Sequence, residues 1–312
     1  MVDRAAADSP AADAVRRALR GRRADLRGTA FQAALFLGLL LALAVLVTLI
    51  GDVVVQSVPV WRDRGADFLT SNLSSLPERA GVFQGIWGSL LLMVFVVVVA
   101  FPLGIGAAVY LEEYSRDSGF TRFLRSNVRN LAGVPAIVYG LLGLAIFVQL
   151  LSGLTGGRGS LMAGGLTMAV LVLPIVIITA AEALRAVPHS IREAAYGVGA
   201  TRWEVIRSHV LPYAAPGVLT GTVLAFARAL GETAPLLLIG GAPGFFATAQ
   251  QGLLDTLRGP YTALPAIIFN WSREARPEFG HMAAAAIVVL LAVLLFINGT
   301  AIYLRNRYER RW

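Results

Sequence analysis

Six long apolar runs constrain this chain of 312 residues more than any other feature of its sequence. About 20 apolar residues in a helix cross the hydrocarbon core of a bilayer. Of the residues, 56% are hydrophobic and only 15% are charged. We therefore predict an all-α integral membrane protein with six transmembrane helices. The expected spans are residues 28–51, 82–111, 131–151, 161–181, 212–240 and 282–304.

Polar segments separate the runs and define the expected organisation. Residues 1–27 hold seven arginines and predict a basic tail before an uncleaved first span, since the first apolar run is too long for a signal peptide. Residues 28–304 form one transmembrane domain, followed by a short tail, 305–312. Residues 112–130 are interpreted as a charged loop. The apolar piece 264–271 is too short to span and predicts an interfacial or re-entrant helix.

The distribution of arginine predicts the orientation of the chain. Six spans place both termini on one side, and the segments on that side carry nineteen arginines against seven in the opposite loops. Loops rich in Lys and Arg stay in the cytoplasm. We therefore expect both termini and the loop at residues 188–212 to be cytoplasmic, in a chain that crosses the bacterial cell membrane several times.

Composition excludes several kinds of chemistry. The chain has no cysteine and no lysine, so it lacks thiolate metal sites and the lysine of a Walker A phosphate loop. Its three histidines are scattered without metal-ligand spacing. We expect no metal, no cofactor in this chain and no enzyme activity. Glu112 and Glu113 are interpreted as a solvated helix end rather than a paired-carboxylate site.

The loop at 188–212 contains the most specific motif, EAAYGVGATRWEVIRSHVLP at 193–212. Thr201 followed three residues later by Glu204 is the pattern of a capping box. Gly199 permits a bend that a side chain would obstruct. We predict two short helical pieces on either side of a glycine bend. An ordinary amphipathic surface loop is the alternative.

This loop resembles the cytoplasmic EAA loop of ABC importer permeases, with His209 at the position where the motif has isoleucine. The resemblance implies that the loop receives mechanical work from a separate ATPase. The residues expected to carry this coupling are Glu193, Ala194, Ala195, Gly199, Thr201 and Glu204.

Four further stretches resemble phosphate importer permeases of the PstA type: YLEEY at 110–114, NLAGVPAIVYG at 130–140, RALGETAPLL at 228–237 and TALPAIIFNW at 262–271. The resemblance implies the type I ABC importer permease fold and inorganic phosphate as substrate. It also implies partners: a homologous PstC-type permease, a dimer of a PstB-type ATPase that binds ATP and Mg, and a periplasmic or lipid-anchored phosphate-binding protein.

Arg228 and Glu232 are the candidate pathway residues. Arg228 follows Pro212 by 16 residues, which is about 24 Å along a helix, and would lie deep in the bilayer. Such a charge normally faces a bundle interior or a cavity. Glu232 would share its helix face. The pair is either a structural ion pair or part of an anion pathway, in which arginine suits phosphate.

Two other functions remain open from the sequence. One is a permease for another oxyanion, such as sulfate or molybdate. The other is an ATP-independent channel or secondary transporter, against which the EAA loop argues because such a protein needs no ATPase-docking loop.

The basic tail generates a first prediction. Blocks of like charge are usually solvated, so deletion of residues 3–15 should leave substrate uptake near normal while the arginines nearest the first span still orient it. Uptake by membrane vesicles, compared at equal amounts of inserted protein, measures this. A complete loss of uptake with normal insertion would refute it.

Overall fold

The structure is a computed structural model, and it describes residues 26–241 and 252–308. The chain divides into two compact units, Met1–Asp52 and Val53–Trp312. Most of the predicted basic tail (1–25) and the end of the C-terminal tail (309–312) lie outside the described residues.

Helix α2 (Leu26–Arg64) contains the described part of the first unit, residues 26–52, and its last turns begin the second unit. The predicted first span, 28–51, is therefore helical, but the helix continues through Asp52 and Pro59. The polar segment expected from residue 52 onward begins only at Gly65, whose φ of +51° ends the helix.

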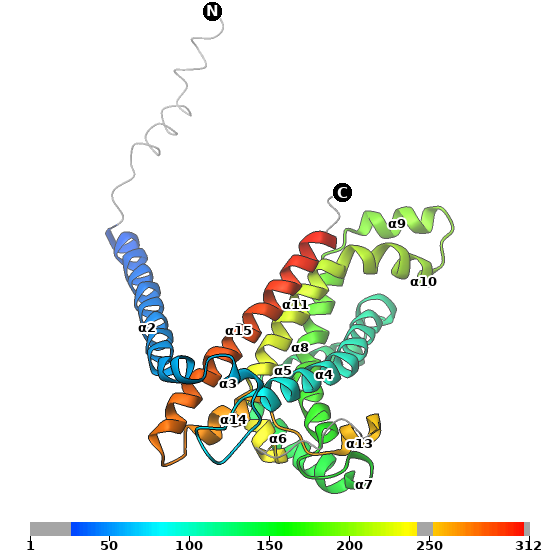
Figure 1. The fold of residues 1–312 in the computed structure, drawn as a ribbon. Coiled ribbons are helices and arrows are strands. Elements are labelled where there is room, and N and C mark those ends of the chain that lie inside the picture. Colours follow the sequence, from blue (N-terminus) through cyan, green and yellow to red (C-terminus); the bar gives the residue numbers. More distant parts are fainter. Residues whose placement is uncertain (1–25, 242–251, 309–312) are drawn as a thin grey trace, which may run out of the picture. The chain divides into compact units, whose positions relative to one another are not determined.

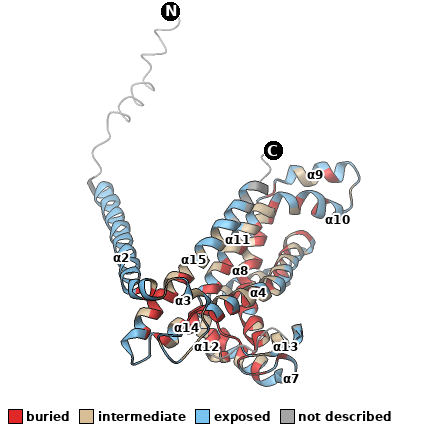
Figure 2. Ribbon diagram, in the orientation of Figure 1, coloured by how far each residue is buried: buried red, intermediate tan, exposed pale blue. Residues whose placement is uncertain are grey.

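The second unit is built on four long helices: α4 (Phe83–Val109), α8 (Leu161–Arg185), α11 (Leu211–Gly231) and α15 (Pro277–Tyr308) (Figure 1). Helix α8 is at the centre. Two thirds of its most apolar window is buried, compared with one third or less in the windows of the other three (Figure 2). Helices α4 and α15 retain exposed apolar faces of the kind that a bilayer covers.

Small residues let α8 approach its neighbours closely. A Cβ atom at Gly165 would collide with the Phe95 ring of α4, and one at Gly164 would lie 2.6 Å from the hydroxyl oxygen of Tyr261. On α4, Gly104 faces Val176 of α8 in the same way. Because lipid is as apolar as a leucine side chain, such backbone approach stabilises helix pairs in membranes.

The predicted third span, 131–151, is helical from Ala136 to Leu150, but a break at residues 133–135 separates this part from the helix before it. Residues 119–132 form α5 (Gly119–Ala132), and the chain then turns into α6 (Ala136–Gly143) and a π-helix, η2 (Leu144–Leu150). The two pieces meet at 100°. Pro135 causes the break: it has no N–H to donate, and its extended ψ of 138° opens the next helix. The predicted charged loop 112–130 is therefore largely helical.

The predicted fifth span is also divided. A 30-residue helix, Arg202–Gly231, runs from α10 (Arg202–Val205) through the π-helix η3 (Ile206–Val210) into α11. It ends at Glu232, whose ψ is 119°, and α12 (Ala234–Ile239) follows with Pro235 in its first turn. The second span continues past 111 as the π-helix η1 (Tyr110–Tyr114).

Short helices close the end of the unit opposite α9 (His189–Gly197) and α10 (Figure 1). The predicted short helix at 264–271 is confirmed as α14 (Leu264–Trp271). Most of its side chains are buried, several of them against α15, whereas Phe269 is 37% exposed. The remaining short helices are α3 (Asp67–Thr70), α7 (Ser152–Thr155) and α13 (Leu253–Arg258).

Five helices of the described chain are long and apolar enough to cross a membrane, and six are if the bent pair α5 and α6–η2 is one span. The predicted six spans therefore agree with the upper count. Orientation of the termini stays a prediction.

Candidate functional site

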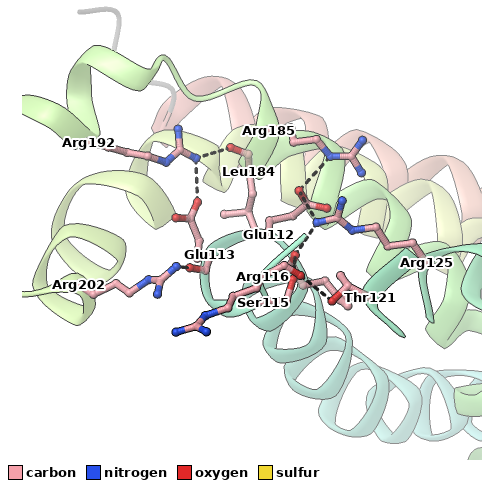
Figure 3. A network of polar contacts seen from close by, with 11 residues as sticks. Glu112, Glu113, Ser115, Arg116, Thr121, Arg125, Leu184, Arg185, Arg192 and Arg202 are labelled. Atoms are coloured by element: carbon pink, nitrogen blue, oxygen red, sulfur yellow. Dashed lines mark hydrogen bonds and ion pairs between the residues drawn. The ribbon is translucent and has the colours of Figure 1, made fainter. Parts of the chain in front are cut away.

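Two adjacent glutamates at the end of the second span contact four arginines from other elements, three through their carboxylates and one through a backbone carbonyl (Figure 3). Both carboxylates belong to η1, and only 8% of either side chain is exposed. In a π-helix the backbone hydrogen bonds connect residues five apart. Within this turn, Glu112 and Glu113 point toward two different groups of arginines. The prediction that Glu112 and Glu113 form a solvated helix end is wrong.

Glu113 fastens the 188–212 loop to the second span. Its Oε1 accepts a hydrogen bond of 2.7 Å from Arg192 of α9, whose side chain is only 15% exposed. Arg192 also donates to the backbone carbonyls of Leu184, in the last turn of α8, and of Val187, just after that helix. Arg202 of α10 donates to the backbone carbonyl of Glu113. Both short helices of the loop are thus bonded to one residue of η1.

Glu112 holds the other side of η1. Its Oε2 lies 3.6 Å from a guanidinium nitrogen of Arg125 in α5 and 3.2 Å from one of Arg185 in the last turn of α8. Arg125 also donates to the carbonyl of Leu111 at 2.7 Å. The four elements α5, α8, α9 and α10 therefore meet at the carboxyl end of α4.

The loop itself has the predicted geometry. Helices α9 and α10 flank Gly199, whose φ is +86°. The capping box is present: the Thr201 hydroxyl accepts from the backbone N–H of Glu204, and the Glu204 carboxylate accepts from that of Thr201. The second helical piece differs from the prediction in one respect, because it continues without interruption into α11.

The loop has an inner and an outer face. Ala195 is buried with Val205 and Val210 against the ends of α4, α8 and α11. Of the other predicted coupling residues, Glu193, Ala194, Gly199, Thr201 and Glu204 are exposed. Three large apolar side chains are exposed beside them: Tyr196, Val198 and Trp203 (45%, 85% and 53% exposed). Ala195 therefore anchors the loop, whereas the remaining residues are available to another chain.

Arg228 and Glu232 are placed together, as predicted, but by a different local geometry. The Nε atom of Arg228 lies 3.7 Å from Oε1 of Glu232. Glu232 is not on the α11 helix face, because it ends the helix in an extended conformation. The Arg228 side chain is 64% exposed and that of Glu232 is 24% exposed. The structure does not bring this pair into contact with the cluster at η1.

A row of exposed residues leads along α11 to Arg228. It repeats at intervals of three or four residues, the spacing of one helix face, and consists of Tyr213, Gly217, Thr220, Leu224, Arg228 and Gly231. Of these residues, only Arg228 is predicted as a site residue from the sequence. The signal is present in the spacing, because a face turned to lipid alone would carry apolar residues throughout.

The apolar pocket behind this row is unsuited to an anion. It lies between α4, α8 and α11 and is lined by Met93, Met168, Phe226 and other apolar side chains, with Ser89 the only hydroxyl among its lining residues. An oxyanion moved into such surroundings would lose its hydration without compensation.

Comparison with known proteins identifies the class. Residues 61–308 match the family model described as "Binding-protein-dependent transport system inner membrane component". The chain belongs to this family, the membrane-spanning permeases of ABC importers, which work with an ATPase and a substrate-binding protein. It is a multi-pass protein of the bacterial inner membrane, and its family is a membrane translocation component of ABC transporters.

Relatives within the family are more specific. The chain is 35% identical over 232 residues to the phosphate transport system permease protein PstA of Yersinia pestis, covering 74% of this chain and 75% of that protein. It is 32% identical over 280 residues to PstA of Mycobacterium leprae, covering 87% of each. These relatives confirm the resemblance stated from the motifs.

Solved structures confirm the fold class. A chain of a bacterial alginate ABC transporter, solved with an alginate-bound periplasmic protein, superposes with a TM-score of 0.64. The match covers 91% of this chain and 98% of that chain at 17% identity. This is the type I importer permease fold.

The bend at Gly199 generates a prediction. Gly199→Leu should abolish uptake while the protein still inserts, because φ is +86° there although no atom obstructs a Cβ. Gly197→Leu is the matched control, since Gly197 also has open space around it but an ordinary helical φ. Uptake and ATPase activity are measured on both. Wild-type coupled transport in Gly199→Leu would contradict the prediction.

The ion pair between Glu113 and Arg192 generates a second prediction from this site. Removing one partner of a buried ion pair typically costs about 3–5 kcal/mol, so Glu113→Gln and Arg192→Gln should each lower heat stability strongly. Their double variant should lose less than the sum, with a coupling of about 0.5–3 kcal/mol. Loss of the monodisperse chromatographic peak after heating measures this.

The control for that pair is Asp117→Asn. Asp117 and Arg122 form an exposed ion pair at 4.0 Å, with side chains 81% and 72% exposed. Exposed pairs contribute little, so this change should leave the heat stability nearly unaltered. Additive losses for Glu113→Gln and Arg192→Gln would show that the two residues act independently.

Proposed function

We propose that this chain is the permease subunit of an ATP-driven importer of inorganic phosphate. It forms the translocation pathway with a homologous PstC-type permease. A dimer of PstB-type ATPase binds ATP and Mg and drives it, and a periplasmic or lipid-anchored phosphate-binding protein delivers the anion. The PstA relatives support phosphate, and the arginine distribution supports cytoplasmic termini.

The exposed guanidinium group of Arg228 is the observation on which we base the position of the translocation pathway. A charge at the centre of a lipid-facing helix costs about 2.5–3.5 kcal/mol on insertion scales, so such residues face a cavity or another protein chain. Arg228 belongs to the exposed row of α11, which also includes the polar residues Tyr213 and Thr220. This row is the face on which we place the pathway and the homologous permease.

Arg228 and Glu232 divide the work on the anion. Arginine donates charge-assisted hydrogen bonds to phosphate oxygens with fixed geometry. Glu232, when ionised, accepts the proton of a P–OH group, which sulfate lacks, and holds Arg228 in place between transport cycles. The pair is neutral, so the homologous subunit supplies further positive charge. Binding must stay weak enough for release.

The loop at 188–212 receives the work of the ATPase. Its outer face offers Tyr196, Val198 and Trp203 beside the bend, and aromatic side chains often anchor protein interfaces. Its inner face is bonded to Glu113 and packed against α4, α8 and α11. A displacement of the loop is thereby passed to the spans rather than absorbed within it.

Competition for uptake distinguishes phosphate from the other candidate substrates. Vesicles that contain the complete transporter and ATP should import radiolabelled phosphate, and neither sulfate nor molybdate in excess should reduce the rate. Import of sulfate or molybdate in preference to phosphate would favour the other oxyanion permease. Phosphate import without an ATPase would favour the channel or secondary transporter.

The pathway assignment gives an asymmetric prediction. Arg228→Gln should abolish phosphate uptake but leave assembly with the ATPase intact, whereas Glu232→Gln should retain part of the uptake. Arg273→Gln, at an exposed arginine between α14 and α15, is the control and should transport normally. Uptake is measured beside a pull-down of the ATPase. Normal transport by Arg228→Gln would refute the pathway role, and failure to assemble would show a structural pair.

A further inference from the structure

Helix α5 separates apolar and basic side chains onto opposite faces. With 100° between successive residues, Phe120, Phe123 and Leu131 lie on one side, and Arg122 and Arg129 lie on the other. The apolar side is not packed against this chain: Phe120 is 68% exposed, Phe123 is 62% and Leu131 is 46%. Exposed apolar side chains gathered on one face of a helix are the kind of patch that marks contact with a membrane or another chain.

The rotation of α5 about its axis is determined by bonds to the rest of the unit. Ser118 caps the helix by accepting from the backbone N–H of Thr121, and the buried Thr121 hydroxyl donates to the carbonyl of Arg116 at 2.9 Å. Arg125 is held by Glu112 and by the carbonyl of Leu111. The phenylalanines therefore cannot turn inward without breaking these contacts.

The bend after α5 sets its direction. The segment α6–η2 has no charged residue and meets α5 at 100°. If α6–η2 crosses the bilayer, α5 lies nearly parallel to the membrane plane. Its level is the end of α8, since Glu112 joins Arg125 to Arg185 in the last turn of α8, from which the chain continues into α9.

We propose that α5 is a membrane-surface helix that binds the anionic phospholipids of the leaflet on the side of the 188–212 loop. Phenylalanines on one face and arginines on the other are the pattern of helices that lie at the boundary between headgroups and acyl chains. Phe120 and Phe123 enter that boundary, and Arg122 and Arg129 contact lipid phosphates. Asp117, 4.0 Å from Arg122, is too exposed to neutralise it.

The absence of cysteine makes a direct test possible, because single cysteines can be introduced without a background. Phe123→Cys carries a nitroxide label on the apolar face, and Ser126→Cys is the matched control, exposed on the polar side. The chain is reconstituted with the subunits that copurify with it, in vesicles of phosphatidylcholine and phosphatidylglycerol. Collision of the label with oxygen and with a water-soluble nickel chelate is measured by electron paramagnetic resonance.

The label at 123 should collide more with oxygen than with nickel, and the label at 126 should show the reverse. Preferential collision with nickel at 123 would overturn the proposal, because the face would be in water. Protection from both reagents at 123 would also overturn it, because a partner subunit would then cover the face. This inference does not depend on phosphate being the substrate.

The anionic headgroup is tested separately. In the unlabelled complex, spin-labelled phosphatidylglycerol should be immobilised in preference to phosphatidylcholine. The double variant R122Q and R129Q should reduce that preference by about fivefold or more, as expected for loss of two surface arginines. The control double variant R79Q and R273Q removes two exposed arginines outside α5, and it should keep the preference for phosphatidylglycerol. An unchanged preference in the α5 variant would overturn the proposal.

Discussion

The close approach of α4 to α8 is the contact on which the rest of the second unit depends. Water does not drive helices together inside a bilayer, so their association requires backbone proximity and dispersion contacts. Glycines supply that proximity at Gly165 and Gly104, where any side chain would meet Phe95 or Val176. With α8 buried, α11 and α12 can pack around it, and the exposed row of α11 is left on the outside.

The ion pairs at the carboxyl end of α4 hold the 188–212 loop against the rest of the second unit. A loop of two short helices has little apolar surface with which to hold its position. The bonds from Arg192 and Arg202 to Glu113 provide a directional attachment, and the buried Ala195 and Val205 add packing. Buried ion pairs stabilise a fold no more than apolar groups do, but they are specific about geometry.

Much of this architecture is predictable from local patterns. Hydropathy located the apolar segments, and the spacing of Gly199, Thr201 and Glu204 predicted the bend and the capping box that the structure contains. The break at Pro135 had a visible signal, because a proline disfavours helix in the residue before it, yet the unbroken hydropathy outweighed it. Helix α5 was missed because its arginines resembled a loop, although its apolar residues repeat with helical spacing.

The burial of Glu112 and Glu113 was not predictable in the same way. Arg192 lies 79 residues after Glu113, and Arg202 lies 89 residues after it. No pattern within a window of one helix reports such a contact, since it exists only once α4, α8 and the loop are packed. Arg228 was found from its charge in an apolar run, but its exposed position and the row leading to it required the folded chain.

The helix from Arg202 to Gly231 is continuous, so α10 and Arg228 belong to one helix. At 1.5 Å per residue it is about 45 Å long. A rotation of its outer end would be passed along the helix to Arg228. Because the guanidinium group of Arg228 lies away from the helix axis, a small rotation of the helix would move that group sideways. The π-turn at η3 and Pro216, which has no N–H to donate, interrupt the regular backbone hydrogen bonds of this helix and are points at which its winding can change.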